Sequence, residues 1–306
     1  MASSIDDKPK LTTINYVNAI AYFSNFLVVF GSTQAGLPDN ATLSAKYQTL
    51  VTPAGYAFSI WGIIFTAELV WTIVQLLPAY RSNALVVSGV GYNFALACLA
   101  QCAWTIFFGL EKITLSLVAM ICILIPLVLI LLKISETSST TYGEYWLLKF
   151  PFLIHAAWIM AATLVNVNVV VVAYKASSEI QAIIGWISLV IVFFVGAYFT
   201  TTIWRKTKRV WVVPCVLVWA TTAIASELSK PNDLILATFS ESTIEQTRGA
   251  SRLVANLLGV FMIAEFVRSQ WLTNRVEGMC DEEREILDSD DGSETPGEAH
   301  QYSSLS

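Results

Sequence analysis

Charge is scarce in this sequence. Only 13% of the 306 residues are Asp, Glu, Lys or Arg, whereas 55% are hydrophobic, and the mean hydropathy is +0.61. A soluble domain carries about 25% charged and about 45–50% apolar residues. The apolar residues also lie in long runs with almost no charge inside them, which is typical of membrane-crossing helices. The composition excludes a soluble enzyme and a nucleic-acid-binding protein, and it predicts an all-α polytopic membrane bundle.

Motifs for catalysis and metal binding are also lacking. The sequence holds no Walker A motif, no H-E-x-x-H and no G-x-S-x-G. Four of its five cysteines lie inside apolar runs and the fifth is Cys280, so no pair is available for a disulfide outside the cytosol. Because no catalytic constellation is complete, we expect neither an enzyme nor a metal site, and no cofactor is certain.

Eight apolar runs are long enough, at about 20 residues, to cross the hydrocarbon layer. They cover about 13–34, 54–78, 85–108, 113–133, 147–174, 181–204, 210–227 and 250–271. The third and fourth are joined only by residues 109–112, which predicts a tight helical hairpin. The first run lacks the cationic start and cleavage site of a signal peptide, so we interpret it as a retained helix.

The distribution of Lys and Arg predicts the orientation. With eight spans, twelve Lys/Arg residues fall on the side of the two termini and six on the other side. Both termini are therefore predicted to be cytosolic. The densest cluster, Arg205–Arg209, anchors this topology or binds lipid headgroups. The sequon Asn40-Ala41-Thr42 falls in the first non-cytosolic loop, so Asn40 is a candidate glycosylation site in a eukaryotic endomembrane or plasma membrane.

The C-terminal segment differs from the rest of the chain. From Glu277 onward it holds ten acidic residues and one basic residue, Arg284. Such a segment cannot bury enough apolar surface to order itself. We expect residues 272–306 to form a disordered cytosolic tail, and a scaffold that recruits a cytosolic partner through it is one hypothesis for function.

Two ionisable residues lie deep inside predicted spans, where charge is costly and functional sites are the first suspicion. Glu68 shares a helix face with Trp61 and Gln75, since the three recur every seven residues. His155 is the only histidine within the spans, so a haem iron ligand from the bundle would be this residue. Each residue has two interpretations: a ligand or proton-carrying role, or a structural hydrogen bond between helices.

Two further stripes of mixed polarity accompany them. His155, Trp158, Ala162 and Asn166 fall on one face of the fifth span, which suits an aromatic, partly polar ligand. Gln101 and Trp104 mark a similar face on the third span. Polar side chains between membrane helices also act as hydrogen-bonding contacts without any ligand.

Three segments carry a family resemblance. They are Val51–Phe65 (VTPAGYAFSIWGIIF), Trp104–Gly109 (WTIFFG), and Pro151-Phe152 followed by Trp158–Asn166 (WIMAATLVN). In this order and spacing they resemble the tryptophan-rich sensory protein/translocator protein family (TspO/MBR). The resemblance covers about residues 13–174, and the later spans resemble the longer branch with about eight helices, in which Trp219 looks typical of the seventh.

The resemblance implies a domain organisation and a site. Residues 1–12 would be a cytosolic tail, 13–174 a five-helix core, and 175–271 three additional helices. The family's ligands are tetrapyrroles (porphyrin, haem) and sterols, and its proposed roles are transport and sensing. The pocket residues carried over are Tyr56, Phe58, Trp61, Gln101, Trp104, Trp158, Ala162 and Asn166, to which we add Glu68 and His155. The family also implies a homodimer, unless the additional helices cover that interface.

Two functional hypotheses remain besides the scaffold. The first is a membrane protein that binds a hydrophobic aromatic ligand in the bundle and is in contact with membrane lipid. The second is a proton-coupled secondary transporter of a small molecule, in which Glu68 and His155 relay the proton.

Overall fold

A computed structural model of the chain describes residues 10–136, 141–203 and 211–291. The start of the predicted N-terminal tail, the Arg205–Arg209 cluster and the predicted tail after Asp291 lie outside these residues. The chain consists of two compact units, Met1–Met262 and Ile263–Ser306, which are described separately.

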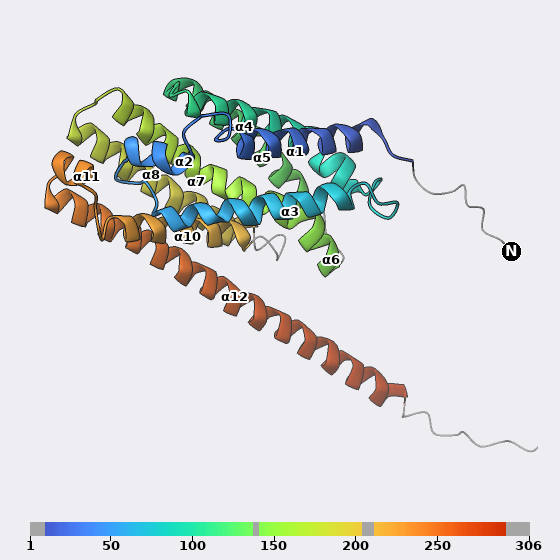
Figure 1. Cartoon of the computed structure of the whole chain (residues 1–306). Coiled ribbons are helices and arrows are strands. Elements are labelled where there is room, and N and C mark those ends of the chain that lie inside the picture. The colour runs from blue at the N-terminus through green and yellow to red at the C-terminus, as the bar shows by residue number, and fades with distance from the viewer. Residues whose placement is uncertain (1–9, 137–140, 204–210, 292–306) are drawn as a thin grey trace, which may run out of the picture. The chain divides into compact units, whose positions relative to one another are not determined.

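Within the described ranges, all regular secondary structure is helical (Figure 1). The elements are α1 (Thr13–Gly31), α2 (Asn40–Lys46), η1 (Gly55–Ser59), α3 (Ile60–Val74), η2 (Leu85–Val90), α4 (Asn93–Gly109), α5 (Ile113–Glu136), α6 (Tyr142–Glu144), η3 (Tyr145–Lys149), α7 (Phe150–Ala173), α8 (Ser178–Tyr198), η4 (Phe199–Ile203), α10 (Val212–Glu227), α11 (Asp233–Thr238) and α12 (Glu241–Asp291). The all-α class predicted from composition is confirmed.

Each of the eight predicted runs contains a helix. Six helical segments are long and apolar enough to cross a membrane: those beginning at Thr13, Gly55, Ile113, Tyr142, Ser178 and Glu241. The other two, α4 and α10, are apolar but shorter, with 17 and 16 residues. The protein is a multi-pass membrane protein, and its third and seventh predicted runs correspond to its two shorter apolar helices.

The first helix shows why a bilayer suits this fold. Asn15, Asn18 and Asn25 of α1 are buried, whereas Ile20 and Leu27 are 66% and 70% exposed. The asparagines bond to other helices: Asn15 Nδ2 donates to the carbonyl oxygen of Gln75 at 3.1 Å, and Asn25 Nδ2 donates to Gln101 Oε1 at 3.1 Å. A helix with polar groups inside and apolar groups outside is stable where the surrounding solvent is lipid.

The connections alternate between two ends of the bundle (Figure 1). At one end, Lys46 in the last turn of α2 pairs with Glu111 in the α4–α5 turn, and Gln48 Nε2 donates to Glu227 Oε1 at the end of α10 at 2.7 Å. At the other end, Asn83 Nδ2 in the α3–α4 connection donates to Glu144 of α6 at 3.2 Å. The α3–α4 connection and α6, which follow the second and fourth predicted spans, therefore lie at the same end of the bundle.

An aromatic cluster fixes three central helices to one another. Trp71 of α3, Phe94 of α4 and Phe152 of α7 are fully buried, and their ring centroids lie 4.9–5.4 Å apart in edge-to-face arrangement. This geometry suits the aromatic quadrupole and adds about 0.5–1.5 kcal/mol per pair beyond the buried area.

Helix α10 packs on the core rather than standing apart from it. The Ala54 N–H donates to the carbonyl oxygen of Ala223 at 3.1 Å, and Trp219 Nε1 donates to the carbonyl oxygen of Ala57 at 3.3 Å. These bonds join α10 to the segment before α3. The predicted core (13–174) and α10 thus share an interior.

The second unit contains the end of α12. Arg268 Nε donates to Glu265 Oε2 at 2.6 Å, three residues away on the helix. The helix runs to Asp291, although the sequence predicts a disordered tail from residue 272. The strong helix formers Glu, Met, Arg and Leu in this stretch account for the difference.

Candidate ligand-binding site

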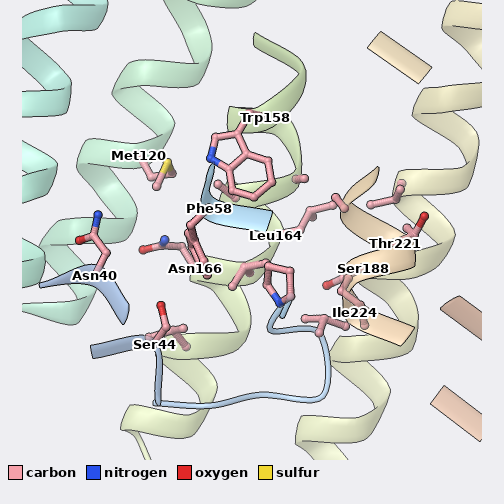
Figure 2. A pocket seen from close by; sticks show the side chains of 18 of the residues that line it. Asn40, Ser44, Phe58, Met120, Trp158, Leu164, Asn166, Ser188, Thr221 and Ile224 are labelled. Carbon is pink, nitrogen blue, oxygen red and sulfur yellow. The ribbon is translucent and has the colours of Figure 1, made fainter. Parts of the chain in front are cut away.

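A cavity, called here the main cavity, lies inside the bundle (Figure 2). The helices that line it are α2, α3, α4, α5, α7, α8 and α10, together with the segment between α2 and α3. The cavity volume is about 70 Å³. This is below the range of about 300–1,000 Å³ for small-molecule pockets, so the space is narrow and its lining must move apart to admit a ligand of that size.

Four aromatic side chains form one wall. The Trp158 ring lies edge-on to Phe58 and Trp61, with centroids 6.0 and 6.4 Å apart. Trp104 completes the wall and stacks on Phe108 at 5.2 Å. Indole and phenyl rings offer a flat apolar ligand a large contact area at low entropic cost.

Asn166 supplies a hydrogen-bond donor in this apolar space. Its Oδ1 accepts from Ser116 Oγ at 3.3 Å and from Trp104 Nε1 at 3.5 Å. An indole nitrogen can only donate, which fixes the orientation of the amide. Asn166 Nδ2 donates to no residue that the structure describes, so it is available to a ligand.

Helices α8 and α10 line the opposite side (Figure 2). The hydroxyls of Ser188 and Thr221 each donate to a carbonyl oxygen four residues earlier, both at 2.8 Å. Asn168 Nδ2 also donates to Ser188 Oγ at 2.8 Å. Because these hydroxyls are satisfied, the surface that α8 and α10 offer to the cavity is largely apolar, with Leu189 and Ile224 beside them.

A second cavity adjoins the first. It lies between α1, α3, α4 and the α1–α2 connection, and its volume is about 220 Å³. Trp61, Trp104 and Asn40 line both cavities, so the two indoles stand between them. Gln101 and Thr105 make the second cavity more polar, and no Lys or Arg is among the residues that line either cavity.

Helix α2 closes the end of both cavities. Asp39 caps it, because Asp39 Oδ1 accepts from the Thr42 N–H at 2.7 Å, and this bond lowers the pKa of Asp39. Lys46 and Tyr47 both donate to Glu111 Oε2, the second at 2.6 Å. These bonds lower the pKa of Glu111, and the bond to Glu111 raises the pKa of Lys46. Glu111 has a positive φ of 56°, which is strained for a residue other than glycine. The α4–α5 turn keeps this backbone conformation and so holds the carboxylate against α2.

Glu68 and His155 lie outside both cavities and bond to each other. His155 Nδ1 is 2.6 Å from Glu68 Oε1, and the two side chains are 1% and 0% exposed. The His155 ring lies edge-on to Trp61 at 5.8 Å, so one indole separates the pair from the cavities. Glu68 Oε2 and His155 Nε2 have no hydrogen-bond partner among the described residues.

The sequence-derived site residues fall into four groups. Phe58, Trp61, Trp104, Trp158, Ala162 and Asn166 line the main cavity. Gln101 lines the second cavity. Glu68 and His155 form the buried pair. Tyr56 lines neither cavity: it is 46% exposed, and its ring contacts Trp219 at 5.2 Å.

Two sets of residues were missed from the sequence. One is the lining from α8 and α10, for which hydroxyls within apolar spans, Ser188 and Thr221, were the available signal. The other is the buried asparagine stripe of α1, whose spacing of three and seven residues marks one helix face. The sequon residue Asn40 is half-buried at the first position of α2, and its glycosylation stays a prediction.

Residues suited to a metal ion are not grouped in the described part of the chain, where no three His, Cys, Asp or Glu side chains come together.

Comparison with known proteins gives one match. The family described as TSPO-like protein matches residues 11–245, which extends through the predicted core and beyond α10 and α11. No curated protein and no solved structure matches the chain.

Proposed function

The chain belongs to the TSPO-like protein family, and we propose that it binds a hydrophobic, aromatic or polycyclic ligand in the main cavity. The observation that carries the proposal is the wall of Phe58, Trp61 and Trp158 facing the apolar side of α8 and α10. Asn166 Nδ2 would bond to one polar edge of the ligand. Binding, for transport or sensing, is the activity proposed, without a chemical step.

Of the two ligand classes implied by the family, a sterol suits the lining better than a tetrapyrrole. A sterol is a slim polycycle with one hydroxyl, which matches a largely apolar lining in which Asn166 Nδ2 can donate a hydrogen bond. Porphyrin and haem carry two propionates, and no Lys or Arg lines either cavity to pair with them. His155 also lies outside the cavities, so it is not positioned to ligate a haem iron there.

The test is a titration of the purified, detergent-solubilised protein with cholesterol, protoporphyrin IX and haem, followed by tryptophan fluorescence. We expect saturable quenching by at least one ligand, with loss of most of the signal and of affinity in Trp158→Ala. The matched control is Trp186→Phe, because Trp186 belongs to α8 but lines neither cavity. Quenching that is unchanged in Trp158→Ala would contradict the assigned site.

A second function, proton-coupled transport of a small molecule, is favoured by the Glu68–His155 pair. A buried carboxylate and imidazole 2.6 Å apart can exchange a proton, and ionisable groups within membrane helices commonly serve such relays. This hypothesis predicts pH-gradient-driven substrate flux into proteoliposomes that Glu68→Gln abolishes. Flux that persists in Glu68→Gln would rule out the relay.

The orientation and partners belong to the same proposal. Both termini would be cytosolic, in an endomembrane or the plasma membrane, with residues after Asp291 free to recruit a cytosolic partner. Glycosylation of Asn40 would place α2 on the lumenal or extracellular side, and an endoglycosidase shift lost in Asn40→Gln would demonstrate it. The homodimer stays a prediction, which cross-linking in native membranes can test.

A further inference from the structure

A polar groove lies between α10 and α12, apart from both cavities. It is lined by Thr222, Ser226 and Ser229 of the α10 side and by Arg252 and Asn256 of α12. Thr222 and Ser226 share one face of α10 by spacing, as do Arg252 and Asn256 on α12, and Ser229 follows the end of α10. Two alanines form the rest of the lining, and the groove volume is about 300 Å³.

Arg252 is a cation without an acidic partner among the described residues. One turn earlier on α12, Arg248 is paired with Glu245. The carboxylate at the end of α10, Glu227, accepts from Gln48 Nε2 at 2.7 Å. The groove therefore carries one uncompensated positive charge, whereas the neighbouring arginine is neutralised.

The other polar side chains in the groove have free hydrogen-bonding capacity. Thr222, Ser226 and Asn256 make no side-chain hydrogen bond within the described chain, and all three are exposed. Two hydroxyls, an amide and a guanidinium supply several donors directed to one space. That combination suits the oxygens of a phosphate, which accept multiple and charge-assisted hydrogen bonds.

The groove lies where a polar stretch gives way to an apolar one. Arg252 immediately precedes the run from Leu253 to Leu272, which holds only two charged residues. About 20 such residues cross the hydrocarbon layer, so the sequence predicts that Arg252 lies at headgroup level. Leu253, Leu257 and Val260 follow on the exposed surface of α12 and offer apolar contact along the membrane interior.

We propose that this groove binds the phosphate headgroup of an anionic phospholipid. Arg252 pairs with the phosphate, and Thr222, Ser226 and Asn256 donate hydrogen bonds to its oxygens. The acyl chains lie along Leu253, Leu257 and Val260. The net negative charge distinguishes this ligand from a zwitterionic lipid, whose quaternary ammonium would bring a second cation toward Arg252.

The experiment is native mass spectrometry of the full chain in detergent, titrated with phosphatidylglycerol or with phosphatidylcholine of the same acyl chains. We expect wild-type protein to hold phosphatidylglycerol more tightly, and Arg252→Gln to weaken it roughly tenfold, as for the loss of a charge-assisted hydrogen bond. Arg248→Gln is the matched control, because it removes the same charge from the same helix one turn away. Its affinity should stay at the wild-type level.

A second variant keeps the charge and tests the donors. Thr222→Val with Ser226→Ala should weaken phosphatidylglycerol binding by a smaller factor, and it provides a result if Arg252→Gln fails to fold. Excess inorganic phosphate should leave the lipid in place, since it lacks acyl chains. The proposal is overturned if the Arg252 and Arg248 variants lose affinity equally, if neither groove variant loses it, or if phosphatidylcholine binds as tightly as phosphatidylglycerol.

Discussion

His155 Nδ1 of α7 lies 2.6 Å from Glu68 Oε1 of α3, and both side chains are excluded from solvent. The bond joins two central helices, and the His155 ring contacts Trp61, which lines both cavities. The distal atoms, Glu68 Oε2 and His155 Nε2, have no partner among the described residues. A buried polar pair of this kind is costly to break, because either residue alone is left unsatisfied.

Glu68→Ala should therefore destabilise the protein by about 3–5 kcal/mol if the pair is ionised. Glu68→Gln retains an oxygen acceptor for His155 and should cost less. Thermal unfolding in detergent measures both. In a double-mutant cycle, Glu68→Ala with His155→Ala should cost less than the sum of the single changes, because neither partner is then orphaned. Additive losses would show that the two side chains do not interact.

The bonds that hold α2 over the cavities should fail in acid. The folded-state pKa of Glu111 lies below its ordinary value of 4.5, because Lys46 and Tyr47 donate to the carboxylate. The contribution to stability is thus present above pH 4.5 and is lost as the pH falls through the lowered pKa. The pKa of Lys46 is raised, so its contribution persists below its ordinary value of 10.5 and is lost only in stronger base. The attachment of α2 is therefore complete at neutral pH.

Hydrogen exchange of the α2 amides measures this attachment. Exchange, corrected for its intrinsic pH dependence, should accelerate on acidification in wild-type protein. Glu111→Gln should show the faster exchange already at neutral pH, and its exchange should respond less to acid. The matched control is Glu179→Gln, since Glu179 is likewise an exposed acid with a lowered pKa but lies at the start of α8. If Glu111→Gln and Glu179→Gln exchange their α2 amides at the same rate, Glu111 does not stabilise the attachment of α2.

Filling the cavity from α10 should weaken ligand binding. Ala220 lines the main cavity, so Ala220→Leu places three more carbon atoms in a narrow space. We expect ligand affinity to fall about tenfold or more, with an overpacking cost of about 1–3 kcal/mol in stability. Val218→Leu, on the same helix but outside both cavity linings, should keep the affinity. If Ala220→Leu binds the ligand with wild-type affinity, α10 does not form part of the site, which then lies within the first five spans.

A close approach between α8 and α12 should make substitution of Gly196 destabilising. A Cβ atom at Gly196 would lie 2.7 Å from both methyl groups of Leu258, which is closer than carbon atoms pack. Gly196→Ala should lower the free energy of unfolding by about 1–3 kcal/mol. Leu258→Ala in the same chain should recover part of the loss, and Gly62→Ala, which meets no atom within 4 Å, is the control. The absence of any rescue would argue against this packing.

Much of the architecture could be predicted from local sequence. Long apolar runs predicted the helices, and the four-residue connection 109–112 predicted the hairpin of α4 and α5, because these features depend on neighbouring residues. The family segments likewise indicated six residues that line the main cavity. The contribution of α8 and α10 was missed, since it depends on packing between helices far apart in the chain.

The Glu68–His155 pair also depends on packing between distant segments, which the sequence does not reveal. Glu68 and His155 were each identified because charge is rare in a membrane span, but their spacing of 87 residues gives no sign that they meet. Tyr56 shows the reverse. Its place in the family segment suggested a pocket residue, but in the 3₁₀ turn η1 its ring packs against Trp219 instead. A side chain's neighbours depend on tertiary packing that a linear motif does not encode.

Photo-cross-linking tests the central claim, that the aromatic wall of the core and the apolar side of α10 form one ligand site. A diazirine-bearing cholesterol analogue is irradiated with the protein in nanodiscs, and labelled peptides are mapped by mass spectrometry. The account predicts labels on both α7 and α10 at cavity residues such as Ala162 and Ile224, which excess cholesterol removes. Labels confined to the exposed outer faces of the helices, or indifferent to competition, would contradict it.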